Sequence, residues 1–347
     1  MNSKAKYLNV AEAIIEMNRF GKQQIPFVFV IDYEMDKILI SAIEDHTGFD
    51  FDINGFTNKP LASDIKAPLY FHIDPVSKSQ YREAFLSLQK ELQYGNSFLS
   101  NLTFPSKIHT DLSLEELYQA SEAKYKLHLP NHCVVFSPES FVKIQDGTIS
   151  SYPMKGTIQA NLANAESKIL ADVKEKAEHS TIVDLIRNDL SRVANEVSVD
   201  KFRYVERIEN NINPLLQVSS KISGKLPDNF AEQLGDILFT LLPAGSICGA
   251  PKKKTVEIIA HAELDKRGYY TGVFGYFDGA NVDSAVMIRF IEKNNGQLFF
   301  RSGGGITAYS NLDAEYAELI DKIYVPLRKH TDTEWAGVQS TFPSSQV

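Results

Sequence analysis

The chain has 347 residues, of which 43% are hydrophobic, and this is enough to bury a large core in one α/β unit or in two sub-domains. Its formal charge of -8 and its isoelectric point near 5.6 argue against nucleic acid as a partner, because a phosphate backbone requires a basic surface. The opening residues lack the apolar stretch of a signal peptide and no apolar run reaches the ~18 residues of a membrane span, so we expect a soluble, cytoplasmic protein.

Two segments in the first half of the chain have the pattern of paired strands. Residues 26–41 and 133–150 each contain two β-branched and aromatic runs around a polar turn, which predicts two hairpins. Between them, residues 77–94 place apolar side chains at helical spacing behind Ser77, a typical N-cap, and ahead of Gly95. This spacing predicts a helix, and a second helix is predicted at about residues 164–177.

The last third of the chain combines strands with a helix. Residues 268–309 contain three strand-like runs separated by turn residues, a pattern typical of an antiparallel meander, and a final helix is predicted from about Asp313 to Lys329. Long antiparallel strands mixed with helices, without regular alternation, favour an α+β fold built on a large sheet or sandwich. The two cysteines, Cys133 and Cys248, show no spacing that indicates zinc, so any metal should have oxygen ligands.

Lys155 stands behind Pro153 and Met154 in the stretch SYPMKGT, at the end of an apolar run that leaves a strand. The order Lys-Gly-Thr lacks the upstream glycines of a phosphate-binding loop, which excludes that interpretation. A solvated lysine is one explanation. The other is an amine in a water-poor pocket, where the pKa of the lysine would be lowered and the amine would be available as a nucleophile.

Glu139, in SPESF, lies sixteen residues before Lys155. If the strands on either side of Gln145–Gly147 pair, its carboxyl group could lie beside the amine. Such a pair can supply a nucleophile and a general acid. The alternative is an exposed glutamate at the end of a strand.

Three glutamates form a candidate metal site. Glu315 and Glu318 are three residues apart on the opening turn of the last predicted helix, so both project from one face. A hard divalent cation would offset their repulsion, and Mg²⁺ takes one or two carboxylates together with substrate oxygens and water. Glu178, on another predicted helix, could supply the third carboxylate. An ordinary solvated acidic helix is the alternative.

Other residues are suited to an anionic ligand. The glycines of RSGGGITAYS, Gly305 among them, could present bare backbone N–H groups between a strand and the acidic helix, although a plain turn would have the same composition. Ser246, in LPAGSICGAPKKK, could donate a hydrogen bond from a second turn. Arg289 lies in the apolar run AVMIRFIEK, where its charge should meet a carboxylate of the protein or of a ligand.

Seven stretches in one order closely resemble the chorismate-utilising enzymes, the family of anthranilate synthase component I and aminodeoxychorismate synthase component I: SPESF, PMKGT, AEHSTIVDLIRNDLSRV, PAGSICGAPK, RGYYTGVFGY, VMIRF and SGGGITAYSNLDAEYAEL. The resemblance implies a chorismate-binding fold, a large antiparallel β-sandwich flanked by helices, with its catalytic core over residues 95–335. Residues 1–94 resemble the shortened N-terminal sub-domain of compact family members. The tail, residues 336–347, is typical of a disordered segment.

The resemblance also implies roles for individual residues. In that family the carboxylates that match Glu178 and Glu318 bind Mg²⁺ directly, and the one that matches Glu315 acts through water. Aminodeoxychorismate synthases have lysine at the position of Lys155, where the sister synthases have alanine. The implied chemistry is attack of Lys155 on C2 of chorismate while the 4-hydroxyl leaves, helped by the acid that matches Glu139. Ammonia then adds at C4, which gives 4-amino-4-deoxychorismate, the precursor of p-aminobenzoate.

The family positions that hold chorismate match Ser246, Tyr270, Arg289 and the backbone of Gly305, with Arg289 as the carboxylate anchor. Three positions depart from the family pattern. Gln217 stands where many relatives have histidine, and Cys248 replaces the usual Thr or Ser. Leu99 replaces the glutamine of most aminating relatives and the lysine base of the hydroxylating ones.

The sequence shows no glutaminase nucleophile, because Cys133 lies within a predicted strand and Cys248 has no histidine nearby. We therefore expect ammonia from a separate glutamine amidotransferase subunit in a heterodimer, and pyruvate removal by another protein. Two alternatives remain. One is anthranilate synthase component I, and the other is a regulatory subunit that binds chorismate without turnover.

Overall fold

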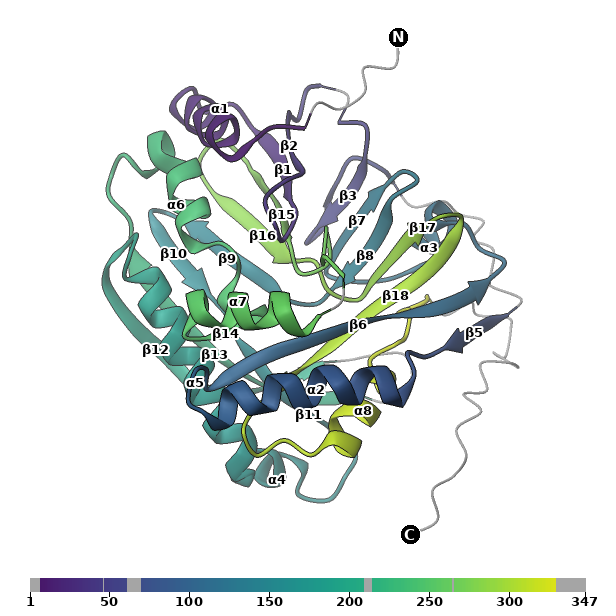
Figure 1. The fold of residues 1–347 in the computed structure, drawn as a ribbon. Helices are drawn as coiled ribbons and strands as arrows, with labels where there is room; N and C mark the ends of the chain where they lie inside the picture. Colours follow the sequence, from purple (N-terminus) through teal and green to yellow (C-terminus); the bar gives the residue numbers. More distant parts are fainter. Residues whose placement is uncertain (1–6, 46, 61–69, 209–213, 264, 329–347) are drawn as a thin grey trace.

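The computed structural model describes residues 7–45, 47–60, 70–208, 214–263 and 265–328. In these residues two antiparallel sheets pack face to face, and helices lie on their outer surfaces (Figure 1). The predicted α+β fold, a large antiparallel β-sandwich flanked by helices, is confirmed.

Sheet A contains nine strands in the described part of the chain. Their order is β11-β13-β10-β9-β16-β15-β1-β2, with β12 also paired to β13. The bounds are β1 (Phe27–Ile31), β2 (Ile38–Ala42), β9 (Ser140–Gln145), β10 (Thr148–Ser151), β11 (Met154–Gln159), β12 (Asn195–Ile208), β13 (Leu215–Lys225), β15 (Val273–Phe277) and β16 (Val282–Val286).

Sheet B likewise has nine strands among the described residues. Their order is β14-β6-β18-β17-β8-β7-β3-β4, with β5 also paired to β6. The bounds are β3 (Asp50–Ile53), β4 (Phe56–Thr57), β5 (Phe71–Asp74), β6 (Leu99–Thr110), β7 (Tyr125–Leu129), β8 (Cys133–Ser137), β14 (Gly249–Ala250), β17 (Phe290–Asn294) and β18 (Gln297–Ile306).

The helices divide between the two outer faces. Those with residues in the core on sheet A are α1 (Val10–Lys22), α5 (Val173–Leu190) and α6 (Leu234–Leu241). Those with residues in the core on sheet B are α2 (Lys78–Gln93), α3 (Leu114–Ala120), α7 (Lys252–Ala262) and α8 (Leu312–Asp321). The remaining helical elements are α4 (Ala165–Ala171), which contacts β11 and β13, and the short turns η1 (Phe230–Gln233) and η2 (Gly245–Ile247).

Strand β1 shows why the sandwich forms. All five of its residues are buried, and successive side chains of a strand point to opposite faces. Phe27 and Phe29 therefore enter the core beneath α1 and α6, whereas Val28 and Val30 enter the core between the two sheets. A strand with both faces apolar requires a layer on each side, which the second sheet and the helices supply.

Two of the places where the chain crosses between the sheets are neighbours. Strand β8 belongs to sheet B and β9 to sheet A, so the chain crosses at Pro138 and Glu139. It crosses back between β16 and β17, where Arg289 lies. The Val286 N–H donates to the Glu139 carbonyl at 3.1 Å, and the Phe136 N–H donates to the Arg289 carbonyl at 3.0 Å. These two bonds hold the crossings together.

This arrangement corrects two strand predictions. Residues 26–41 form the predicted hairpin, since β1 pairs with β2. Residues 133–150 contain three strands, of which only β9 and β10 form a hairpin, because β8 pairs with β7 and β17 in the other sheet. The predicted meander over 268–309 has four strands rather than three, and they are divided between both sheets.

Three helix predictions can be compared with the structure. The helix over 77–94 is confirmed as α2, and Ser77 accepts a hydrogen bond from the Gln80 N–H as its N-cap. The helix over 164–177 is two helices, because Asp172 is extended at ψ 114° and caps the start of α5. The last helix ends at Asp321 instead of Lys329.

The division into a sub-domain over residues 1–94 and a catalytic core stays a prediction, because it came from a resemblance in sequence. In the structure, β1 and β2 are strands of sheet A, and β3 and β4 are strands of sheet B, so both parts of the chain share the two sheets. The predicted tail over 336–347 lies outside the described residues. No helix in the described part is both long and apolar enough to cross a membrane.

Candidate active site

Lys155 projects from a β-bulge. Strand β11 pairs with β13, and the register shifts between Met154 and Thr157, where Gly156 has a positive φ of 85°. A bulge re-aims the side chain next to it. The Lys155 Nζ lies 2.7 Å from Oε2 of Glu178, which is 4% exposed on α5. The structure therefore brings together the lysine of PMKGT and the glutamate of AEHST.

The structure matches neither alternative considered for Lys155, a solvated lysine or an amine with a lowered pKa in a water-poor pocket. Burial by itself lowers the pKa of this amine, but the charge and hydrogen bond of Glu178, together with Glu175 and Glu318, raise the pKa above the ordinary lysine value. The pocket is rich in carboxylates rather than apolar. With Glu178 as its ion-pair partner, Lys155 is an ammonium ion.

Glu318 of α8 lies near enough for its charge to act on Lys155, and Glu315 lies beside Glu318. Asn311 caps this helix by accepting from the Asp313 and Ala314 N–H groups. Glu318 Oε1 and Glu315 Oε2 lie 3.7 Å and 3.8 Å from the position that a Cβ would occupy on Gly304. Gly304 belongs to β18, so the glycines of this stretch form a strand and not the turn considered from the sequence.

The side chains of Glu178 and Lys155 both lie close to the backbone of the neighbouring Gly305. The position of a Cβ on Gly305 is 3.2 Å from Cδ1 of Leu99, 3.4 Å from Nζ of Lys155 and 4.0 Å from Oε2 of Glu178. A methyl group there would crowd this cradle. The methyl group of Leu99 and the amine of Lys155 thus both border the Gly305 backbone.

Two further side chains of the cluster escaped the sequence analysis. Glu175 lies one helical turn before Glu178 on α5, and its Oε2 has no hydrogen-bond partner among the described residues. Burial, together with the nearby charges of Glu178 and Glu318, raises the pKa of Glu175, although Lys155 acts against this shift. Lys322, just after α8, donates to the Gly303 carbonyl at 2.8 Å and pairs with Glu318 at 2.7 Å. The three-residue spacing of Glu175 and Glu178 was visible in the sequence.

The donor set fits a hard cation. No three His, Cys, Asp or Glu side chains in the described ranges are arranged to hold a metal as they stand, and two lysine ammonium groups pair with Glu178 and Glu318. All the converging donors are carboxylate oxygens, which are ligands suited to Mg²⁺. The unpartnered Oε2 of Glu175 adds a carboxylate oxygen whose charge interacts with Lys155, Glu178 and Glu318.

Glu139 lies at the first crossing between the sheets. Its carboxyl group bonds the Ser246 hydroxyl from the η2 turn. Burial raises the pKa of Glu139, and Ser246, Arg289 and Lys322 offset part of this rise. The predicted pairing of β9 with β10 is confirmed. Glu139 nevertheless bonds Ser246 and feels the charges of Arg289 and Lys322, rather than interacting with Lys155.

The sequence had indicated that Arg289 lies within a strand. In the structure it lies instead at the second crossing, between β16 and β17. Its backbone is left-handed, with φ 53°, a conformation that costs a non-glycine residue about 1–2 kcal/mol. Within the described ranges no carboxylate pairs with its guanidinium, and the buried Nε has no hydrogen-bond partner. The sequence predicted a carboxylate of the protein or of a ligand as its partner; the described residues supply none that pairs with it, which leaves these donors available to a ligand.

Tyr270 is buried beside this arginine. Its ring packs against Phe290 at 5.7 Å between centroids, and burial raises the pKa of its hydroxyl to about 12. Of the three departures from the family pattern, Cys248 is buried and contacts the Tyr33 hydroxyl at 3.7 Å. Gln217 lies on β13 opposite Thr157 of β11.

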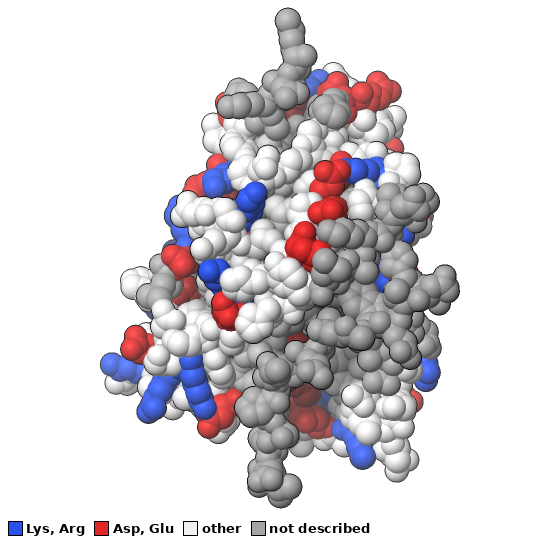
Figure 2. All heavy atoms as spheres, turned by 90° about the vertical axis from the view of Figure 1, so that its right-hand side faces the viewer, with Lys and Arg blue, Asp and Glu red and all other residues white. Residues whose placement is uncertain are grey.

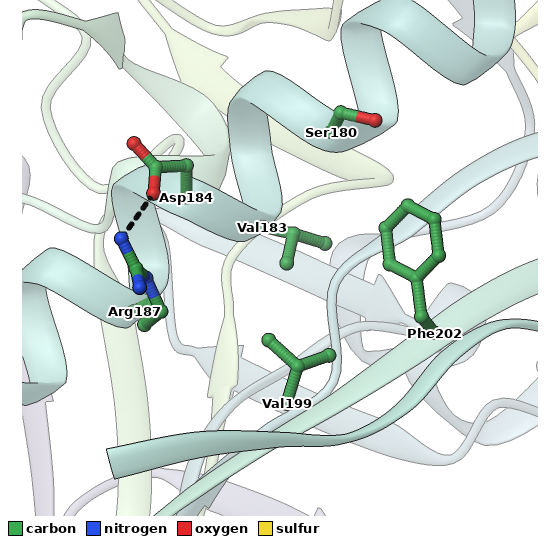
Figure 3. Close-up of a pocket in the computed structure, with 6 residues that line it drawn as sticks. All are labelled: Ser180, Val183, Asp184, Arg187, Val199 and Phe202. Carbon is green, nitrogen blue, oxygen red and sulfur yellow. Dashed lines mark hydrogen bonds and ion pairs between the residues drawn. The ribbon is translucent and has the colours of Figure 1, made fainter.

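A surface depression lies next to α5, on the side of the helix away from the carboxylates of the site. A depression of about 460 Å³ lies between α5 and β12, and its lining includes Ser180, Asp184 and Phe202 (Figure 3). At 100° per residue these α5 side chains lie on the side opposite to Glu178. On the face of the molecule in Figure 2, acidic and basic side chains are interspersed among uncharged ones.

Known proteins are similar to this chain in sequence. A model of chorismate binding enzymes matches residues 28–328. An uncharacterized PabA-like protein of Haemophilus influenzae is 52% identical over 90% of this chain and 96% of its own length. Aminodeoxychorismate synthase component 1 of Salmonella typhimurium is 34% identical over 72% of this chain, which spans 57% of that protein.

Solved structures agree in fold. A putative 2,3-dihydroxybenzoate-specific isochorismate synthase of Bacillus anthracis has a TM-score of 0.69 at 20% identity and covers 91% of this chain and 88% of its own. Anthranilate synthase component I of Streptococcus pneumoniae has a TM-score of 0.66 at 22% identity and covers 86% of this chain and 79% of its own. The chain belongs to the family of chorismate binding enzymes.

Proposed function

We propose that this protein aminates chorismate at C4 to give 4-amino-4-deoxychorismate, with Mg²⁺ as cofactor and with ammonia from a glutamine amidotransferase partner. The observation that carries the proposal is the placement of Lys155 Nζ 2.7 Å from Glu178, beside the Gly305 backbone and the methyl group of Leu99. The 34% identity to an aminodeoxychorismate synthase component 1 supports the same branch of the family.

In this proposal the carboxylates of Glu178 and Glu318 hold the cation, with Glu315 next to them. The cation would supply positive charge that neutralises these carboxylates and the ring carboxylate of the substrate, and would thereby lower the pKa of Lys155. The amine then attacks C2 of the ring. Covalent attachment divides one difficult substitution into two easier steps.

Glu139 acts as the general acid. Its raised pKa favours the protonated carboxyl group that must deliver a proton to the leaving 4-hydroxyl. Arg289 binds the carboxylate of the substrate with donors that the described residues leave free. Ammonia adds at C4, the bond between Lys155 and C2 breaks, and the amine is regenerated. Leu99 offers no base that would activate water instead.

The test is product analysis. The protein is incubated with chorismate, Mg²⁺ and an ammonium salt, and the products are separated by chromatography with and without an added lyase for 4-amino-4-deoxychorismate. We expect 4-amino-4-deoxychorismate, and p-aminobenzoate only when the lyase is present. Formation of anthranilate would instead identify an anthranilate synthase. Unchanged chorismate that is nevertheless bound would identify a regulatory subunit.

The amidotransferase partner requires its own test. With glutamine in place of the ammonium salt, we expect product only after an amidotransferase subunit is added. Co-elution of the two chains in size-exclusion chromatography would support a heterodimer. Product from glutamine without any second protein would refute this part of the proposal.

A further inference from the structure

Two arginines near the site differ in their partners, and of these Arg267 is buried whereas Arg289 is partly buried. Arg267 is 1% exposed, and hydrogen bonds to Glu263, Ile247, Asn101 and Thr271 use the N–H groups of its guanidinium. Arg289 makes no hydrogen bond or ion pair through its guanidinium with any described residue. Arg267 is fixed by the protein, whereas Arg289 needs another means of support.

The contact recorded for the Arg289 guanidinium is an aromatic one. Its Cζ lies 5.0 Å from the centroid of the Tyr324 ring, within the range of a cation–π interaction. The N–H donors of a guanidinium lie in its plane. An aromatic ring attracts the charge without accepting from those donors, so they stay available for a carboxylate.

The segment that carries Tyr324 is itself held in place. The Glu122 N–H donates to the Pro326 carbonyl at 2.8 Å, and the Arg328 N–H donates to the Ala120 carbonyl at 2.9 Å. On the other side of Tyr324, Lys322 donates to the carbonyl of Gly303 at 2.8 Å. Hydrogen bonds on both sides of Tyr324 thus fix its segment between the end of α3 and strand β18.

We propose that Tyr324 is a positioning residue, whose ring orients the Arg289 guanidinium for the substrate carboxylate. This inference rests on the proposed function, because it takes Arg289 as the carboxylate anchor. Tyr324 is 47% exposed, so its replacement removes little buried surface. A cation–π contact at a partly exposed site corresponds to about a two- to fivefold change in affinity.

The experiment compares Tyr324→Leu, Tyr324→Phe and Arg289→Lys with the unaltered protein. A matched control is Tyr94→Leu, since Tyr94 is 72% exposed on the surface and lies 5.9 Å from the ammonium group of Lys90. Calorimetric titration of chorismate with Mg²⁺ and without ammonia gives the Kd. Product formation at saturating chorismate gives kcat, and thermal unfolding checks the fold of each variant.

We expect Tyr324→Leu to raise the Kd about two- to fivefold with kcat nearly unchanged, and Tyr324→Phe and Tyr94→Leu to behave like the unaltered protein. An unchanged Kd in Tyr324→Leu, together with a raised Kd in Arg289→Lys, would overturn this inference and leave the anchor intact. Equal losses in Tyr324→Phe and Tyr324→Leu would overturn it too, because the hydroxyl would then be responsible. An unchanged Kd in Arg289→Lys would overturn the anchor in the proposed function as well.

Discussion

Glu139→Gln removes one titratable proton and leaves the shape of the side chain nearly unchanged, so it tests the general acid directly. Glu139 bonds Ser246, and burial raises its pKa. Loss of a positioned acid lowers a rate by about 10²–10⁴-fold, or about 3–5 kcal/mol in the barrier. We expect kcat to fall by this factor. The KM for chorismate should change by less than about threefold, because the binding groups remain.

The pH profile separates this role from a structural one. In the unaltered protein, kcat should decline as pH rises through the raised pKa of Glu139, and the variant should lack this alkaline limb. The stability effect has a definite sign. A carboxyl group with a raised folded-state pKa contributes stability that is present below its unfolded pKa of about 4.3 and is lost as pH rises through the folded value. The Tm of Glu139→Gln at neutral pH should therefore equal or exceed that of the unaltered protein.

A surface glutamate supplies the control. Glu257 is 50% exposed and pairs with Lys254 at 3.1 Å, so Glu257→Gln should leave kcat and the pH profile unchanged. Chromatographic assays at several pH values from about 6 to about 9 measure both variants. If Glu139→Gln retained kcat within about threefold and kept the alkaline limb, the assignment of Glu139 as the acid would be wrong.

Three other outcomes are expected. Lys155→Ala should lower product formation by more than about 10³-fold, and retained turnover would refute the covalent step. The affinity for Mg²⁺ in a calorimetric titration should not fall, because the ammonium group that competes for Glu178 is gone. Gly305→Ala should raise the KM for chorismate about tenfold, since the new methyl group would stand 3.2 Å from Cδ1 of Leu99 and 3.4 Å from Nζ of Lys155. An unaltered KM would contradict this crowding. Arg267→Met should lower the free energy of unfolding by about 3–5 kcal/mol in urea titrations, because the 5% exposed Glu263 loses its partner, and a loss below about 1 kcal/mol would contradict this.

Local pattern predicted much of the fold. The apolar residues of 26–41 and of 77–94 define a hairpin and a helix because the side-chain periods of 2 and 3.6 residues are properties of the backbone itself. The order of the motifs indicated the family, and the i, i+3 spacing placed Glu315 and Glu318 on one face. In the same way, the spacing of Glu175 and Glu178 was available in the sequence but was not used.

What the sequence by itself determined about this protein was therefore the strands within 26–41, 133–150 and 268–309, the helix α2 with parts of α4, α5 and α8, and the residue types of its candidate site. Tertiary structure decided which sheet each strand joins, since pairing depends on partners far along the chain: it separated β8 from β9 and placed Glu139 and Arg289 at adjacent crossings. It also decided the charge of Lys155. Carboxylates from α5 and α8 raise the pKa of that amine, and Coulomb interactions depend on distance in space rather than on separation in sequence.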